Sequence, residues 1–232
     1  MSPAPSPRVI ALDGPSGSGK STVARGVARR LGLAYVDTGA TYRAATLAAL
    51  RAGIDLADAD ALDRVVAAAD ISLSVDPEAP GVRLDGEDVS AEIRGPEVTA
   101  AVSTVSAVPG VRRHLVRLQR VLTAEGAVLE GRDIGTVVVP DAPVKIFLDA
   151  DPEVRAARRA ADDDAGVRNN GDVVQAVAVD LARRDRLDST RATSPLQAAG
   201  DAVHLDASRL SAQEVIDRVL ALAVAAGFEV AG

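Results

Sequence analysis

Apolar and polar residues follow one another along this chain in the order of a repeated strand–helix fold. Residues 8–12 (RVIAL) form a short apolar run before a glycine-rich turn, which predicts a buried strand. From Lys20 to Leu31 apolar residues recur every four positions, which predicts an amphipathic helix. Gly32 follows at the position where a glycine commonly ends a helix. Residues 8–32 therefore predict half of a βαβ unit.

The same alternation continues to the C-terminus. Ser211 and Glu214 have the spacing of a capping box and predict the start of a terminal helix. Strands that alternate with helices indicate an α/β fold with three layers, in which helices cover both faces of a parallel sheet. Further strands are predicted at 127–129, 144–148 and 202–205, and further helices at 41–51, 61–69, 111–122, 152–161 and 173–186.

Two segments depart from this pattern. Between Ile71 and Val89 apolar residues alternate with polar ones, and Asp85-Gly86 is a hairpin turn signal, so we expect a small β-rich insertion outside the main sheet. Residues 162–172 (DDDAGVRNNGD) are polar and rich in glycine and asparagine, which predicts a mobile loop.

Composition narrows the classes of function. The 232 residues suit a single α/β domain, expected at 8–232, with 1–7 as a disordered tail rather than a signal peptide. The net charge of −7 argues against a nucleic-acid polymer as partner, and no apolar run approaches the length of a membrane span. Aromatic residues make up 2% of the chain, so base stacking on aromatic side chains is not expected. Cysteine is absent from the sequence, which suits a cytoplasmic protein.

The glycine-rich turn after the first strand carries the clearest chemistry. It matches G-x-x-x-x-G-K-[ST], the P-loop pattern, and stands between a predicted strand and a predicted helix. In such a loop backbone N–H groups surround phosphate oxygens, the lysine reaches the β and γ phosphates, and the following hydroxyl binds Mg²⁺. We expect Lys20 to be catalytic and Ser21 to ligate Mg²⁺. The predicted ATP-binding residues are Gly14, Pro15, Ser16, Gly17, Ser18, Gly19, Lys20, Ser21 and Thr22.

A P-loop does not by itself name a function, because GTPases, motors and small-molecule kinases share it. The chain lacks the Asn-Lys-x-Asp guanine signature, which disfavours a GTPase, and its size disfavours a motor. Arg132 and Asp133 follow a predicted strand and a glycine. They should lie at the carboxyl edge of the sheet, where open α/β sheets bind ligands.

Longer motifs resemble those of the bacterial cytidylate kinase family, P-loop enzymes that phosphorylate nucleoside monophosphates. They are D-x-G-x-x-Y-R from Asp37 to Arg43, the run from Gly131 to Leu148, then R-A-x-R-R and R-x-x-x-D-x-x-R from Arg184 to Arg191. The resemblance extends from about residue 8 to the terminal helix and includes the β-rich insertion. It implies transfer of a phosphoryl group from ATP, with Mg²⁺, to CMP and dCMP. It also implies a CMP-side insertion at about 64–100 and a helical lid at about 153–187.

The resemblance also implies roles for individual residues. Asp133 and Arg112, with Ser103, would read the cytosine edge, whereas O4 of uracil would be repelled by Asp133. Arg43, Arg132 and Arg191 would hold the phosphate of CMP, and Arg184 and Asp188 the sugar hydroxyls. Arg155, Arg158 and Arg159 would close over the phosphoryl group as catalytic lid residues. The full set of implied CMP-binding residues is Thr38, Tyr42, Arg43, Ser103, Arg112, Arg132, Asp133, Arg184, Asp188 and Arg191.

Some points stay open at this stage. Thr38 stands where many family members have serine and Glu130 where many have aspartate, and Glu130 receives no role. Asp37 fits an N-cap as well as a catalytic part. The competing functions are another small P-loop kinase, such as a shikimate or adenylate kinase relative, and an ATP-binding switch without phosphoryl transfer. We expect a monomer whose partners are small nucleotides.

Overall fold

A five-stranded parallel sheet forms the centre of the molecule. The computed structural model describes residues 8–163, 171–191 and 193–230. The strands lie in the order β2-β6-β1-β7-β8, so β1, which precedes the P-loop, is in the middle. All neighbouring pairs of this sheet are parallel. The bounds are β1 (Val9–Asp13), β2 (Ala34–Asp37), β6 (Ala127–Gly131), β7 (Val144–Asp149) and β8 (Val203–Asp206).

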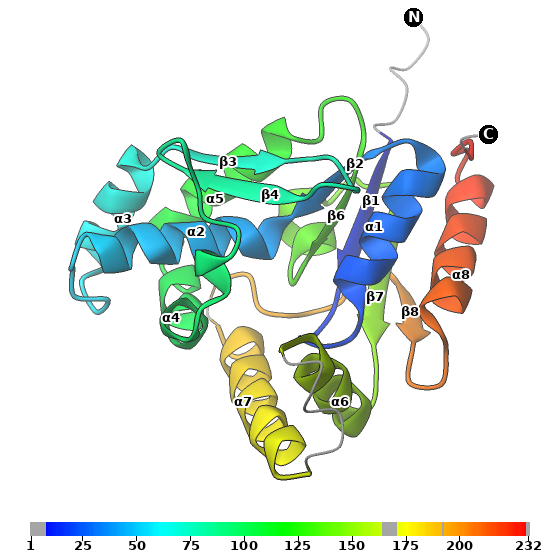
Figure 1. Cartoon of the computed structure of the whole chain (residues 1–232). Coiled ribbons are helices and arrows are strands. Elements are labelled where there is room, and N and C mark those ends of the chain that lie inside the picture. The colour runs from blue at the N-terminus through cyan, green and yellow to red at the C-terminus, as the bar shows by residue number, and fades with distance from the viewer. Residues whose placement is uncertain (1–7, 164–170, 192, 231–232) are drawn as a thin grey trace, which may run out of the picture.

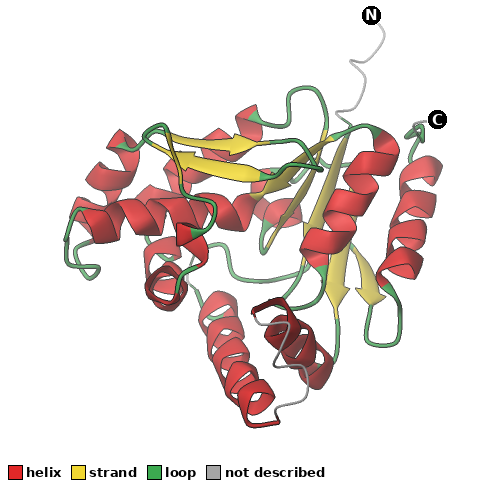
Figure 2. Cartoon of the chain, viewed as in Figure 1, coloured by secondary structure: helices red, strands yellow, loops and turns green. Residues whose placement is uncertain are grey.

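Helices cover both faces of this sheet, as the sequence predicts. Ile10 and Leu12 of β1 join a core formed with α1 (Lys20–Leu31) and α8 (Ala212–Ala225). Val9 and Ala11 face the other way, toward α5 (Pro109–Val121) and the short π-helical turn η2 (Ile134–Val138). Because side chains alternate along a strand, a strand such as β1 that is apolar from Val9 to Leu12 is buried on both faces. The three-layer α/β fold is confirmed (Figures 1 and 2).

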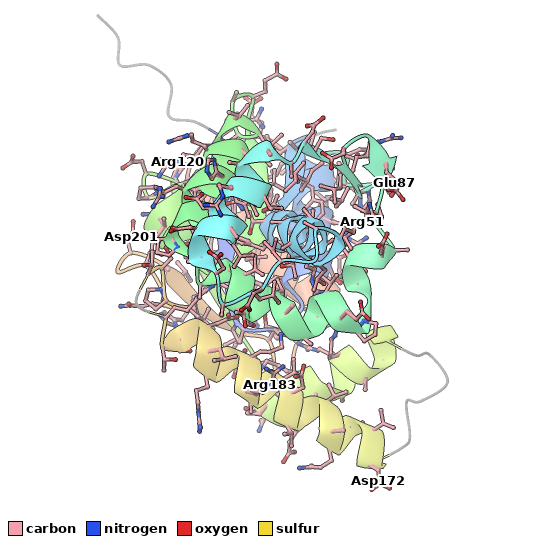
Figure 3. All side chains as sticks on the ribbon, turned by 90° about the vertical axis from the view of Figure 1, so that its left-hand side faces the viewer. Arg51, Glu87, Arg120, Asp172, Arg183 and Asp201 are labelled. Carbon is pink, nitrogen blue, oxygen red and sulfur yellow. The ribbon has the colours of Figure 1, made fainter. Side chains whose placement is uncertain are left out.

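The β-rich segment forms its own antiparallel sheet, separate from the central one (Figure 2). Its strands are β3 (Ile71–Ser74), β4 (Gly81–Leu84) and β5 (Glu87–Asp88). Asp85 and Gly86 have φ angles of 51° and 83°, the left-handed values of a two-residue hairpin turn. Arg51 at the end of α2 (Thr38–Arg51) binds Glu87 at 2.8 Å, and Figure 3 shows this contact at the surface.

The remaining helices lie around the insertion and below the carboxyl ends of the strands. The first group contains α3 (Ala59–Ala68), the turn η1 (Glu92–Arg94) and α4 (Pro96–Ser106). The second is the pair α6 (Pro152–Asp163) and α7 (Gly171–Ser189), toward which β7 and β8 point (Figure 1). In the described part of the chain no helix combines the length and the apolar character that crossing a membrane requires.

The structure corrects several predicted boundaries. The helix expected at 41–51 begins at Thr38, because Asp37 caps it by accepting a hydrogen bond from Ala40 N. The helix α4 was not predicted, since its valines and threonines favour strands, and the short strand β2 was also missed. Of the loop expected at 162–172, both ends belong to helices α6 and α7, whereas 164–170 lie outside the described residues. The tail expected at 1–7 also lies outside them.

Candidate functional site

The carboxyl ends of β2 and β6, together with the P-loop that follows β1, border a cavity of about 340 Å³. Residues 16–23 of the P-loop and α1 line one part of it, and residues 130–133 at the end of β6 line the middle. Helices α2, α4, α5, α6 and α7 contribute side chains around the remaining wall. The cavity therefore lies at the sheet edge where α/β folds bind ligands.

Glycines allow the P-loop its path. A side chain at Gly14 would approach the carbonyl oxygen of Leu148 to 2.0 Å, and Gly17 has a φ of 78° with the backbone of Arg155 close by. Ser18 Oγ and Lys20 Nζ both donate to the carbonyl of Pro15, at 3.0 and 2.7 Å. The loop thus closes on itself and turns toward the start of α1, whose N–H groups and dipole favour an anion.

Lys20 is the buried cation of this loop, with 6% of its surface exposed. Burial lowers the pKa of its ammonium group to about 7, and the nearby charge of Arg132 contributes to this shift. The carboxylates of Glu130, Asp13 and Asp185 act in the opposite direction. A bound phosphate would stabilise the charged form of Lys20, because its negative charge compensates for the loss of solvation on burial.

Glu130 is the buried acid next to this lysine. One carboxylate oxygen accepts from Ser21 Oγ at 2.9 Å, and the other accepts from the hydroxyl of Tyr35 at 2.5 Å. Burial and the charge of Asp37 raise the pKa of Glu130. A carboxylate and a hydroxyl oxygen are ligands that Mg²⁺ takes. The described residues hold no group of three acidic, histidine or cysteine side chains that could hold a metal ion by themselves.

Arginines line much of the cavity wall, and two of them, Arg132 and Arg158, also contact the P-loop backbone. Burial lowers the pKa of Arg43 to about 10, and the charges of Arg184 and Arg159 add to this effect. Burial, followed by the charge of Arg132, lowers the pKa of Arg184 as well. Guanidinium groups that repel one another in a buried place are stabilised by a multivalent anion. The cavity-lining arginines are Arg43, Arg94, Arg112, Arg132, Arg158, Arg159, Arg184 and Arg191.

Asp188 organises two of these arginines. Its carboxylate accepts from Arg132 Nε at 3.0 Å and lies 3.8 Å from Arg191 Nη1. Arg132 also donates to the carbonyl of Gly14 at 3.1 Å, so it joins α7 to the base of the P-loop. Two chain segments far apart in the sequence therefore hold one group of charges in place.

Asp133 and Arg112 form a buried ion pair at the end of β6, with 4% and 3% of their surfaces exposed. The guanidinium of Arg112 also lies 5.1 Å from the ring centre of Tyr42. Within the described residues, buried Tyr42 Oη, Arg112 Nε, Arg184 Nε and Arg191 Nη2 have no hydrogen-bond partner. Buried polar groups without a partner are costly, and these four belong to residues that line the cavity.

The structure brings together nearly all of the side chains that the sequence singles out. Gly14 and Pro15 form the base of the loop rather than the cavity wall. All the other predicted P-loop and acceptor residues line the cavity, as do Arg158 and Arg159: Ser16, Gly17, Ser18, Gly19, Lys20, Ser21, Thr22, Thr38, Tyr42, Arg43, Ser103, Arg112, Arg132, Asp133, Arg184, Asp188 and Arg191.

Arg155 departs from its expected place. Its guanidinium does not line the cavity but donates to Asp185 at 2.5 Å and to the carbonyls of Ser16 and Ala150, both at 3.1 Å. Three acceptors thus fix this side chain between α7 and the P-loop. Arg158 also reaches the loop backbone, with Nη1 donating to the carbonyl of Ser18 at 3.3 Å, so α6 contacts the P-loop through both arginines.

Other lining residues were missed or left open. Sequence motifs did not identify Arg94 or the apolar strip of Ala207, Leu210, Ala212 and Val215. Small apolar residues after a last strand carry no chemical signal, so only the fold reveals this strip. Asp37, left open above, is the N-cap of α2 and also borders the cavity.

Comparisons with a family model and with known proteins all match this chain to the same family. The family model described as cytidylate kinase matches residues 10–225. A cytidylate kinase of Rhodococcus opacus is 56% identical over 214 residues, which cover 91% of this chain and 93% of that protein. One from Mycolicibacterium paratuberculosis is 54% identical over 213 residues, with 91% and 92% covered. One from Nocardia farcinica is 53% identical over 227 residues, with 95% and 97% covered.

Proposed function

The chain belongs to the cytidylate kinase family, and from this premise we propose how its cavity transfers the γ-phosphoryl group of ATP to CMP and dCMP. The main observation that supports the proposal is that a phosphate-binding loop and a second polar site line the same cavity. A P-loop lies at one side, and a buried Asp133–Arg112 pair with a group of arginines lies at the other. An enzyme of this kind must hold a triphosphate and an acceptor together.

The acceptor half suits a cytidine monophosphate. Ionised Asp133 accepts hydrogen bonds, as the N4 amino group of cytosine requires, and Arg112 donates, as N3 and O2 require. Arg43, Arg132 and Arg191 hold the phosphate. The sugar hydroxyls bind Arg184 and Asp188, and the base edge is completed by Ser103, with Thr38 and Tyr42 on the neighbouring wall.

The donor half supports direct in-line transfer. An oxygen of the CMP phosphate attacks the γ-phosphorus while the bond to the β,γ-bridging oxygen of ATP breaks, giving CDP and ADP. That oxygen is already anionic at neutral pH, so no residue has to remove a proton. Charge on the transferring group is balanced by Lys20 and by Arg158 and Arg159 of α6. We propose that α6 and α7, within about 153–187, close as a lid and exclude water.

The residues beside the P-loop fit Mg²⁺. Ser21 Oγ and Glu130 are already in contact at 2.9 Å, and Tyr35 fixes the other carboxylate oxygen. We propose that Ser21 ligates the ion and that Glu130 orients Ser21 or a bound water. When bound with ATP, Mg²⁺ neutralises charge on the β and γ phosphates.

Family membership decides between the functions that the sequence left open. A chain 56% identical to a cytidylate kinase over nine-tenths of its length belongs to that family, which favours phosphoryl transfer to a cytidine nucleotide over a shikimate or adenylate kinase activity and over a switch without phosphoryl transfer. For the finer points we propose a monomer that acts in the cytoplasm on free nucleotides. Residues about 64–100 form its CMP-side insertion.

Release of ADP, measured with each acceptor in turn, tests the proposed function. With ATP and Mg²⁺ we expect rapid release with CMP and dCMP, and much slower release with UMP, AMP, GMP or shikimate, because only cytosine satisfies both Asp133 and Arg112. Removal of Mg²⁺ by a chelator should abolish turnover. Equal rates with all nucleotides, or release that no acceptor stimulates, would contradict the proposal.

The pH dependence of the enzyme should report Lys20. Because burial lowers the pKa of this ammonium group to about 7, it loses its proton as the pH rises above 7. We expect kcat/KM for ATP, which reports the free enzyme, to fall above that pH. The kcat should fall less, because bound phosphates restore the proton.

Lys20→Arg is the matched variant for this measurement, since a guanidinium stays charged over the whole range. Its kcat/KM for ATP should be lower than that of the wild type but should not fall as the pH rises above about 7. A wild-type profile as flat as that of Lys20→Arg would exclude Lys20 as the titrating group.

A further inference from the structure

Asp13 is a buried carboxylate that the mechanism above does not use. It is the last residue of β1, directly before the P-loop, and has 3% of its surface exposed. Its two oxygens accept hydrogen bonds from Ile134 N at 2.7 Å and from Gly135 N at 2.8 Å. More than 120 residues separate the partners, so this contact ties the start of the P-loop to the segment that follows Asp133.

These two N–H groups belong to the first turn of η2, for which Asp133 is the N-cap residue. An aspartate at an N-cap ordinarily turns its side chain back onto the N–H of the second or third helical residue. Asp133 makes no such bond. Its carboxylate instead pairs with Arg112, on the wall of the cavity. At the start of η2, Asp13 therefore accepts the hydrogen bonds of the free N–H groups, whereas Asp133 faces the cavity.

A simpler explanation is that Asp13 only satisfies buried N–H groups. Burial raises the pKa of Asp13 to about 6, although the N–H groups of Gly135 and Ile134 oppose the shift, and the charge of Asp133 adds to it. A second buried acid beside Asp133 is thus a costly way to cap one turn. Burial of the Asp13 carboxylate has a use if its hydrogen bonds prevent the two N–H groups from competing for the carboxylate of Asp133.

We propose that Asp13 is a positioning residue for base selection: by capping η2 in place of Asp133, it leaves the Asp133 carboxylate free to face Arg112 and the cytosine amino group. This rests on the proposed function, in which Asp133 reads the base. Without Asp13, the unpaired N–H groups of Ile134 and Gly135 draw Asp133 onto the helix start and away from the cavity.

The test compares kcat/KM for CMP and for UMP in the wild type, Asp13→Asn, Asp133→Asn and the double variant. In Asp13→Asn the NH₂ group of the new amide faces one of the two N–H groups, which then has no acceptor. We expect the ratio of kcat/KM for CMP to that for UMP to fall about tenfold. In the Asp133→Asn background, Asp13→Asn should not narrow the ratio further, because both changes act on the same carboxylate. Thermal unfolding checks that each variant is folded, and Asp13→Ala replaces Asp13→Asn if the amide prevents folding.

Asp58→Asn is the control, since Asp58 caps α3 at the surface by accepting from Ala61 N at 2.9 Å. It should leave the ratio unchanged. Equal losses with CMP and UMP in Asp13→Asn, while Asp133→Asn narrows the ratio, would overturn the positioning role alone. An unchanged ratio in Asp133→Asn would overturn the base-reading role and the positioning role with it.

Discussion

Lys20→Ala is expected to lower kcat by about 10²–10³-fold while the chain stays folded, because the ammonium group balances charge that builds up in the transition state. Its position supports this expectation: Lys20 lines the cavity and is held by the Pro15 carbonyl at 2.7 Å. The bond to Pro15 is also lost in the variant, but the turn keeps the Ser18 contact to the same carbonyl. Single-turnover measurements at saturating ATP separate this loss from weaker binding.

Lys145→Ala is the matched control, since Lys20 and Lys145 are the two lysines of the chain. Lys145 lies on β7 and binds Asp201 at 2.7 Å, outside the cavity. Because only 9% of the Lys145 side chain is exposed, its replacement should lower the free energy of unfolding, while kcat stays close to that of the wild type. Near-normal turnover of Lys20→Ala would remove Lys20 from the mechanism.

The sequence predicted the bounds of an element correctly where a local motif, such as a cap or a glycine-rich loop, marks its ends. The helix Lys20–Leu31 has the predicted bounds because a glycine-rich loop precedes it and Gly32 ends it in the left-handed conformation. The capping box of Ser211 and Glu214 is present as predicted. By contrast, α4 has β-branched residues that favour strands, and it is helical because Val98, Val102 and Val105 pack into the core around the insertion.

The sequence predicted which residues form the site, but it did not predict which of them contact one another. Motifs pointed to Arg132 and Asp133, whereas only the fold shows that Arg132 pairs with Asp188 and Asp133 with Arg112. Glu130 received no role until its contacts with Ser21 and Tyr35 were known. Asp13 escaped notice because a lone acid at the end of a strand has no signature, and its two partners lie in a distant segment of the chain.

Asp133→Asn is expected to reduce the preference for CMP over UMP, mainly by impairing the use of CMP. The ionised carboxylate suits the N4 amino group of cytosine and repels O4 of uracil, whereas an amide can donate to O4. A buried charged group left unpaired by the wrong base costs about 1–3 kcal/mol or more. Sites of this kind reject the wrong ligand far better than apolar pockets do.

The alternative is that Asp133 acts only as a structural partner for a neighbouring arginine. The structure identifies that partner as Arg112 rather than Arg132, because Arg132 pairs with Asp188. If Asp133 did no more than hold Arg112, the variant would lose activity with CMP and with UMP in equal proportion. Asp201→Asn, at the surface partner of Lys145, is the control for an aspartate change that leaves the cavity intact.

The ratio of kcat/KM for CMP to that for UMP, measured in the wild type and in Asp133→Asn, tests most directly the claim that this cavity selects cytosine. We predict a high ratio in the wild type that falls by about tenfold or more in the variant, with Asp201→Asn unchanged. An equal ratio in the wild type and Asp133→Asn would contradict the claim.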